Sequence, residues 1–107
     1  MPHFVVEYFD RPGSGEARAA NRQAHTAYRV DLGVRLVLAG PLFEDFDGSP
    51  AQGSLVILEA ADKAEASAIA HRDPYAQAGA FQEIRVFAHR ILVLNPPPKA
   101  PEPEGRP

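Results

Sequence analysis

The sequence has no cysteine, no tryptophan and a single methionine. Without cysteine the chain cannot form disulfides, thiolate zinc sites or thiol nucleophiles. Basic residues are also few, 11 against 14 acidic residues, which gives a formal net charge of −3. This balance argues against a nucleic-acid-binding protein, which needs a basic surplus on one face, and against a polybasic membrane anchor. The apolar runs fall well short of the about 18 residues that span a bilayer.

The remaining composition is that of one ordinary globular domain. The chain has 107 residues, of which 45% are hydrophobic and 23% are charged. A length of this order accommodates one domain with a thin core. No charged start followed by an apolar core indicates an export signal, so the expected compartment is the cytoplasm.

The composition changes sharply after Leu94. The last 13 residues, 95–107, hold more than half of the 11 prolines of the chain. Proline lacks an amide donor and fixes φ, so this segment is predicted to be an extended, Pro-rich C-terminal arm. The arm is either a solvated tail or a segment that lies across a partner subunit. The expected domain therefore comprises residues 1–94.

Strand-like and helix-like segments alternate within this domain. Segments rich in β-branched and other apolar residues predict four strands, at 3–9, 34–42, 54–59 and 83–94. Two alanine-rich segments, 16–32 and 62–70, predict helices. Asp62 is the predicted N-cap of the second helix, and Asp73-Pro74 predicts a further short turn of helix with Asp73 at its N-cap. The order β-α-β-β-α-β is that of an α+β, ferredoxin-like fold with an antiparallel sheet and both helices on one face.

The second and third predicted strands are apolar on both faces. Leu36-Val37-Leu38-Ala39 and Leu55-Val56-Ile57-Leu58 contain no polar residue, whereas a strand with one wet face alternates apolar and polar residues. Two helices can cover only one face of the sheet, and apolar burial contributes about 25 cal/mol per Å2. We therefore predict a homodimer in which a second copy covers the other face. The alternative cover, the Pro-rich arm folded back, is a poor lid.

The first predicted helix carries a stripe of basic residues. Arg18, Arg22, His25 and Arg29 are spaced four, three and four residues apart, so they share one helix face. The stripe is either a solvated surface or an anion-binding face in which His25 accepts a proton. Imidazole is the side chain best suited to proton transfer near neutral pH.

A catalytic histidine needs a partner that fixes its tautomer. The aspartates that could supply this partner are Asp31, Asp45, Asp47, Asp62 and Asp73. Asp73 lies just past the second helix, and in a split βαβ fold the two helices lie side by side. Asp73 can therefore reach the first helix, although an aspartate before proline is also a good helix cap. Both roles are compatible, because a carboxylate has two oxygens.

The other histidines, His3, His71 and His89, are typical of packing or surface positions. No HxH or HExxH spacing supports a metal site, so we expect no bound metal. Gly40-Pro41 and Gly53-Ser54 mark strand ends, and glycine there would let backbone amides approach a ligand if a pocket opens.

Several short motifs occur in a fixed order along the domain. They are Arg22-Gln23-Ala24-His25-Thr26-Ala27-Tyr28, Ala39-Gly40-Pro41-Leu42, Gly53-Ser54 with Glu59, and Asp73-Pro74-Tyr75 with Ala78-Gly79. Together they resemble the YciI-like (YCII-related) family, which is similar to muconolactone-isomerase-like proteins. The resemblance implies a dimeric α/β-barrel of ferredoxin-like subunits and an active-site histidine–aspartate pair, here His25 and Asp73.

The family resemblance also suggests a chemistry, since at least one branch eliminates chloride from a chlorinated hydroxyquinol. We therefore expect cofactor-free and metal-free proton transfer by a lyase, isomerase or dehydrochlorinase. Asp73 would orient His25, and His25 would take a proton from a small anionic or phenolic metabolite. The residues expected to bind this substrate are Arg18, Arg22, Tyr28, Gly40, Pro41, Ser54 and Tyr75.

Two other functions are compatible with the same residues. A non-catalytic module could bind a metabolite, or serve as an accessory subunit of a larger pathway enzyme. A cofactor-free monooxygenase of a related barrel type needs a dry aromatic pocket. It is the least favoured, because aromatic residues make up only 8% of the chain.

Overall fold

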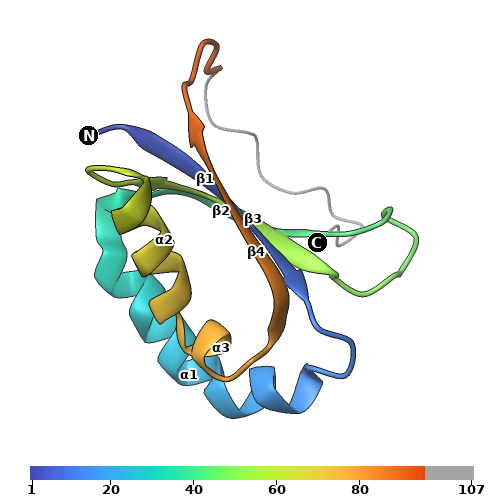
Figure 1. The fold of residues 1–107 in the computed structure, drawn as a ribbon. Coiled ribbons are helices and arrows are strands. Elements are labelled where there is room, and N and C mark those ends of the chain that lie inside the picture. The colour runs from blue at the N-terminus through green and yellow to red at the C-terminus, as the bar shows by residue number, and fades with distance from the viewer. Residues whose placement is uncertain (96–107) are drawn as a thin grey trace.

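The computed structural model describes residues 1–95. Its elements are β1 (His3–Asp10), α1 (Gly15–Leu32), a 3-10 turn η1 (Gly33–Arg35), β2 (Leu36–Leu42), β3 (Gly53–Glu59), α2 (Lys63–Arg72), α3 (Pro74–Gln77) and β4 (Phe81–His89). The strands form one antiparallel sheet in the order β2-β3-β1-β4. All three helices lie on one face of this sheet (Figure 1). The predicted ferredoxin-like α+β fold is confirmed, and the predicted Pro-rich arm, from residue 96 on, lies outside the described residues.

Two of the predicted strands have boundaries that differ from the structure by two or more residues. The second strand begins at Leu36 rather than at residue 34, because η1 follows α1 directly. The fourth strand runs from Phe81 to His89 rather than from 83 to 94. His89 pairs with His3, the first residue of β1, so β1 offers no partner for a longer β4.

The hydrophobic core lies between the sheet and the helices. β1 contributes Phe4, Val6 and Tyr8, and these alternate with side chains that point to the other face. The remaining buried apolar residues are Val56, Leu58, Ala60, Ala66, Ile69, Ala70, Tyr75, Ala80 and Phe81. α1 has no fully buried residue, although Ala17, Tyr28 and Leu32 pack against the core. α1 therefore rests on the core along one edge and leaves room for a cavity beside it.

The face of the sheet opposite the helices is apolar along its centre. The strand register places Leu38, Ile57, Val5 and Phe87 in one row across all four strands. Leu38 and Phe87 are each 49% exposed, which is unusual for large apolar residues in the middle of a sheet. The row is left uncovered by the helices.

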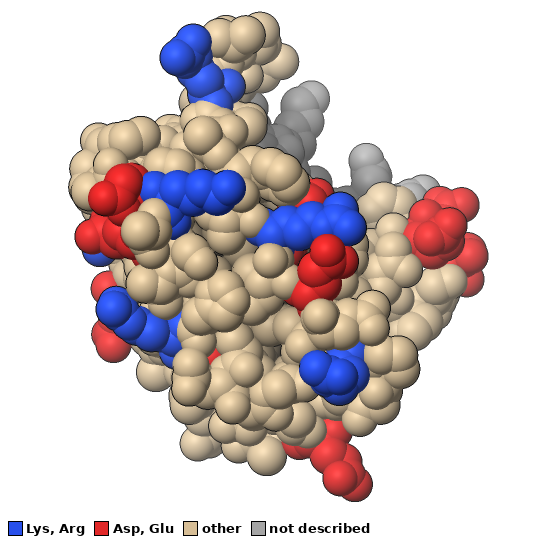
Figure 2. Space-filling view, in the orientation of Figure 1, with Lys and Arg blue, Asp and Glu red and all other residues tan. Residues whose placement is uncertain are grey.

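Charged side chains do not gather by sign on the surface that Figure 2 shows. Basic and acidic groups alternate over this side of the molecule, and no single basic patch forms there. No helix in residues 1–95 combines the length and apolar character that crossing a bilayer requires.

Candidate functional site

The site is built around Asp73, which joins α2 to α3. Pro74 follows at the first position of α3, and the carboxylate of Asp73 accepts a hydrogen bond from the backbone amide of Tyr75 at 2.9 Å. The predicted capping role of Asp73 is therefore confirmed. The residue is only 2% exposed, and a carboxylate at this depth needs compensating partners.

His25 of α1 supplies one of these partners. Its Nδ1 lies 2.8 Å from Oδ1 and 3.0 Å from Oδ2 of Asp73. An ionised carboxylate only accepts hydrogen bonds, so Nδ1 carries the hydrogen and Nε2 is left as the proton acceptor of the ring. The imidazole also stacks on the ring of Tyr75, with 3.9 Å between centroids and 10° between planes. These contacts fix both the tautomer and the orientation of His25.

A cavity of about 280 Å³ lies beside this pair, between α1 and the adjoining ends of β2 and β3. Its lining consists of Arg18, His25, Arg29, Ala39, Gly40, Pro41, Gly53, Ser54, Tyr75 and Phe81. Residues distant in the sequence thus meet here, including five of the seven expected to bind substrate. The exceptions are Arg22, which is exposed, and Tyr28, whose hydroxyl donates to the carbonyl of Ile69 at 2.7 Å.

Two arginines of α1 bring positive charge to the cavity. Arg18 donates to Asp10 at 3.0 Å, and its guanidinium carbon lies 4.6 Å from the centre of the Tyr75 ring. Arg29 approaches Asp73, with 3.9 Å between Nε and Oδ2. The basic stripe is therefore not simply a solvated face, because three of its four members line the cavity.

Sequence reasoning did not name Arg29, Ala39 or Phe81 as lining residues, and it named Gly53 only as a strand end that would admit a ligand if a pocket opened there. The helical spacing placed Arg29 on the correct face, and this was the signal that could have identified it. The packing of the sheet also requires glycine at position 53, because a Cβ there would lie 2.1 Å from the carbonyl oxygen of Tyr8. The sequence could not predict that Phe81 lines the cavity, because the position of Phe81 depends on how α3 leads into β4.

Two of the other aspartates considered as partners serve local roles. Asp62 accepts from the amide of Glu65 at the start of α2, which confirms its predicted capping role. Asp47 accepts from Ser49 in the loop between β2 and β3. Neither residue lines the cavity.

Two tyrosines near Asp73 remain neutral at physiological pH. Burial, and then the negative charge of Asp73, raise the pKa of the Tyr8 hydroxyl far above its ordinary value. The same two causes, in the same order, raise the pKa of Tyr28. Neither phenol can act as a base near neutral pH.

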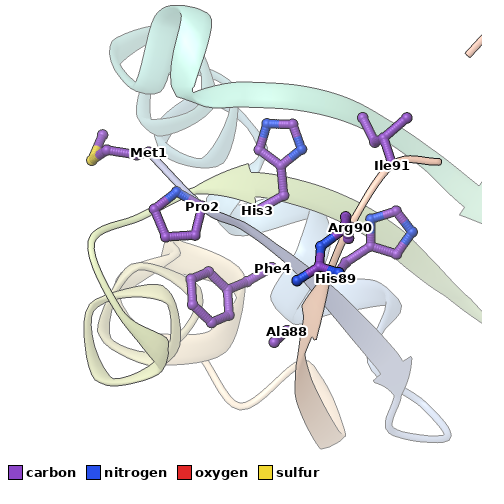
Figure 3. A pocket seen from close by; sticks show the side chains of 8 residues that line it. All are labelled: Met1, Pro2, His3, Phe4, Ala88, His89, Arg90 and Ile91. Atoms are coloured by element: carbon purple, nitrogen blue, oxygen red, sulfur yellow. The ribbon is translucent and has the colours of Figure 1, made fainter.

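A second, larger cavity of about 530 Å³ lies at the opposite end of the sheet. Figure 3 shows its lining of Met1, Pro2, His3, Phe4, Ala88, His89, Arg90 and Ile91. No carboxylate lines this cavity, and the nearest partner of His3 is Glu59, at 3.5 Å outside the lining. The smaller cavity is therefore the better candidate, because it contains an oriented imidazole. Within residues 1–95, no group of three or more histidine and acidic side chains is arranged to hold a metal ion.

Comparison with known proteins identifies the family. The sequence model of the YCII-related domain matches residues 1–90. This chain belongs to the YCII-related family. No curated protein matches it.

Among solved structures, the chain is similar to 5-chloro-2-hydroxyhydroquinone dehydrochlorinase (TftG) from Burkholderia phenoliruptrix AC1100, in complex with 2,5-dihydroxybenzoquinone. The two are 31% identical over 82% of this chain and 93% of that chain, with a TM-score of 0.73. The cofactor-independent oxygenase SnoaB from Streptomyces nogalater is 15% identical over 87% of this chain and 96% of its own, with a TM-score of 0.49.

Proposed function

We propose that this member of the YCII-related family is an enzyme that transfers a proton without a metal or cofactor. Its substrate is a small anionic or phenolic molecule. The observation that carries the proposal is the buried carboxylate of Asp73, which holds Nδ1 of His25 at 2.8 Å beside a cavity. At about 280 Å³ the cavity suits a molecule of one ring rather than a larger ligand.

The chemistry follows from the state of the imidazole. Nε2 of His25 takes a proton from a C–H or O–H group of the substrate, and Asp73 stabilises the imidazolium that forms. The electron pair left on the substrate forms a new double bond. A leaving group such as chloride then departs in an elimination, or the imidazolium returns the proton to another carbon in an isomerisation. The 31% identity to a dehydrochlorinase supports the elimination.

Chloride release from 5-chloro-2-hydroxyhydroquinone tests this proposal. The variant His25→Ala should lower kcat/KM by about 10²- to 10⁴-fold, the usual contribution of general acid–base catalysis. His71→Ala is the matched control, because His71 is an exposed histidine at the end of α2. It should remain within about twofold of the wild type. Wild-type turnover in His25→Ala would contradict the proposal, and ligand binding without turnover in the wild type would favour a binding module.

We further propose that the protein is a homodimer that packs sheet against sheet. Support comes from the exposed apolar row on the face without helices and from Leu92, Val93 and Leu94 beyond β4, which are 78–84% exposed. A second copy removes this surface from water, and such burial is the main driving force for association.

The variant Phe87→Glu should convert this dimer to a monomer, because it places a charge at the centre of the apolar row. Size-exclusion chromatography with light scattering at micromolar concentration measures the change as a halving of the mass. Val30→Glu adds the same charge at an exposed position of α1, on the other side of the sheet, and should leave the dimer intact. A wild-type protein with the mass of one chain would rule out the dimer.

A further inference from the structure

Arg29 is the cation of the cavity with the most spare hydrogen-bonding capacity. Arg18 is engaged by Asp10 at 3.0 Å, whereas the ion-pair contact of Arg29 within residues 1–95 is the 3.9 Å approach to Asp73. That distance is beyond hydrogen-bond length. The guanidinium of Arg29 is thus attracted to Asp73 without being bonded to it.

The remaining donors of Arg29 are open to a ligand. A guanidinium has five N–H donors in a planar fork, which matches the oxygens of an anion. Among the described side chains, no buried nitrogen or oxygen lacks a partner. Because the side chain of Arg29 is 21% exposed and lines the cavity, its unbonded donors are accessible from there.

Asp73 does not fully neutralise the positive charge of Arg29. Its oxygens already accept from Nδ1 of His25 and from the amide of Tyr75. One negative charge is therefore shared between an imidazole, a backbone amide and a more distant guanidinium. An incoming anion can bind Arg29 without displacing any of the hydrogen bonds of Asp73.

Building on the function proposed above, we propose that Arg29 binds the negatively charged oxygen of the substrate and restricts the site to ligands that carry one. Arg29 follows His25 by four residues, so both side chains project from one face of α1. An oxygen held by Arg29 therefore brings the rest of a one-ring substrate next to the proton acceptor. Arg22, which the sequence analysis placed with Arg18 among the expected substrate-binding residues, is exposed and outside the cavity.

Calorimetric titration with 2,5-dihydroxybenzoquinone tests the role of Arg29. This acidic enol is the ligand that the similar dehydrochlorinase holds. Arg29→Gln should raise its Kd by about 10- to 100-fold, as expected for the loss of a charge-assisted hydrogen bond. Arg29→Lys, which keeps the charge, should recover part of the affinity. Arg22→Gln removes the same charge from the same helix outside the cavity, and it should raise Kd by less than about threefold.

The neutral dimethyl ether of the same quinone, which is larger by two methyl groups, separates charge from packing when its response to Arg29→Gln is compared with that of the acid. 2,5-dimethoxybenzoquinone should bind the wild type at least about tenfold more weakly than the acid, and Arg29→Gln should affect it little. Three results would each overturn the role of Arg29. They are an equal loss of affinity in Arg22→Gln and Arg29→Gln, an equal loss of affinity for both ligands in Arg29→Gln, and no binding of the acid by the wild type. If Arg29→Gln does not fold, the proposal is still tested by the preference of the wild type for the acidic over the neutral ligand and by the affinity of Arg29→Lys. The proposed function fails separately, through turnover in His25→Ala.

Discussion

Replacing Asp73 by alanine should abolish turnover and also lower the free energy of unfolding by about 3–5 kcal/mol, the usual effect of removing one partner from a buried charged pair. The change leaves Nδ1 of His25 and the amide of Tyr75 without their acceptor, and it removes the negative charge that attracts the guanidinium of Arg29. Urea denaturation measures the stability, and chloride release measures the turnover. Both losses should appear together.

Two matched variants separate the roles of Asp73. Asp62→Ala removes a cap of the same kind from α2, where no histidine is involved, and should cost only about 1 kcal/mol. Asp73→Asn keeps an oxygen for the amide of Tyr75 but no charge for an imidazolium. It should retain most of the stability and still lose about 10²-fold or more in turnover. An Asp73→Asn variant with normal turnover would reduce Asp73 to a helix cap.

The variant Gly53→Ala should lose at least about 3 kcal/mol of stability, because overpacking at a site that cannot relax is strongly destabilising. An added Cβ would lie 2.1 Å from the carbonyl oxygen of Tyr8 and 3.3 Å from Cα of Phe9. Both neighbours are backbone atoms of β1, which pairs with β3 at this position. Neither can rotate away, so the strands must separate, and the cavity wall that Gly53 forms moves with them. Thermal unfolding followed by circular dichroism should show a melting temperature lower by more than about 10 °C.

Gly40→Ala provides the control for this prediction. Gly40 also lies in a strand and lines the cavity, but a Cβ there meets no atom within 4 Å. Its melting temperature should stay within a few degrees of the wild type. Similar losses in both variants would show that the contact with Tyr8 does not control stability at these positions.

The order of the elements could be predicted from the sequence, because each one has a local signal. Alanine-rich stretches, a proline after Asp73 and runs of β-branched residues all act over a few neighbours. The end of β4 could not be predicted in this way. Ile91 to Leu94 are as apolar as the strand before them, and only the pairing of His89 with the first residue of β1 ends the strand.

The candidate site was predicted in part for the same reason. The spacing of α1 placed Arg18, His25 and Arg29 on one face, and the resemblance to a family connected His25 with Asp73. Which arginine lines the cavity depends on how α1 is rotated above β2 and β3, and periodicity does not determine that rotation. Tyr28 belongs to a motif of the family, yet its hydroxyl is bound to the carbonyl of Ile69.

The stacking of His25 on Tyr75 has a spectroscopic consequence. The ring centroids are 3.9 Å apart and the planes are nearly parallel, so the imidazole lies over the π face of the phenol. Hydrogens held over such a face experience a ring current that opposes the applied magnetic field. The carbon-bound imidazole protons of His25 should therefore resonate upfield, apart from those of the other members of a set of only four histidines. One-dimensional proton spectra of the unlabelled protein can thus follow this one side chain as ligands are added.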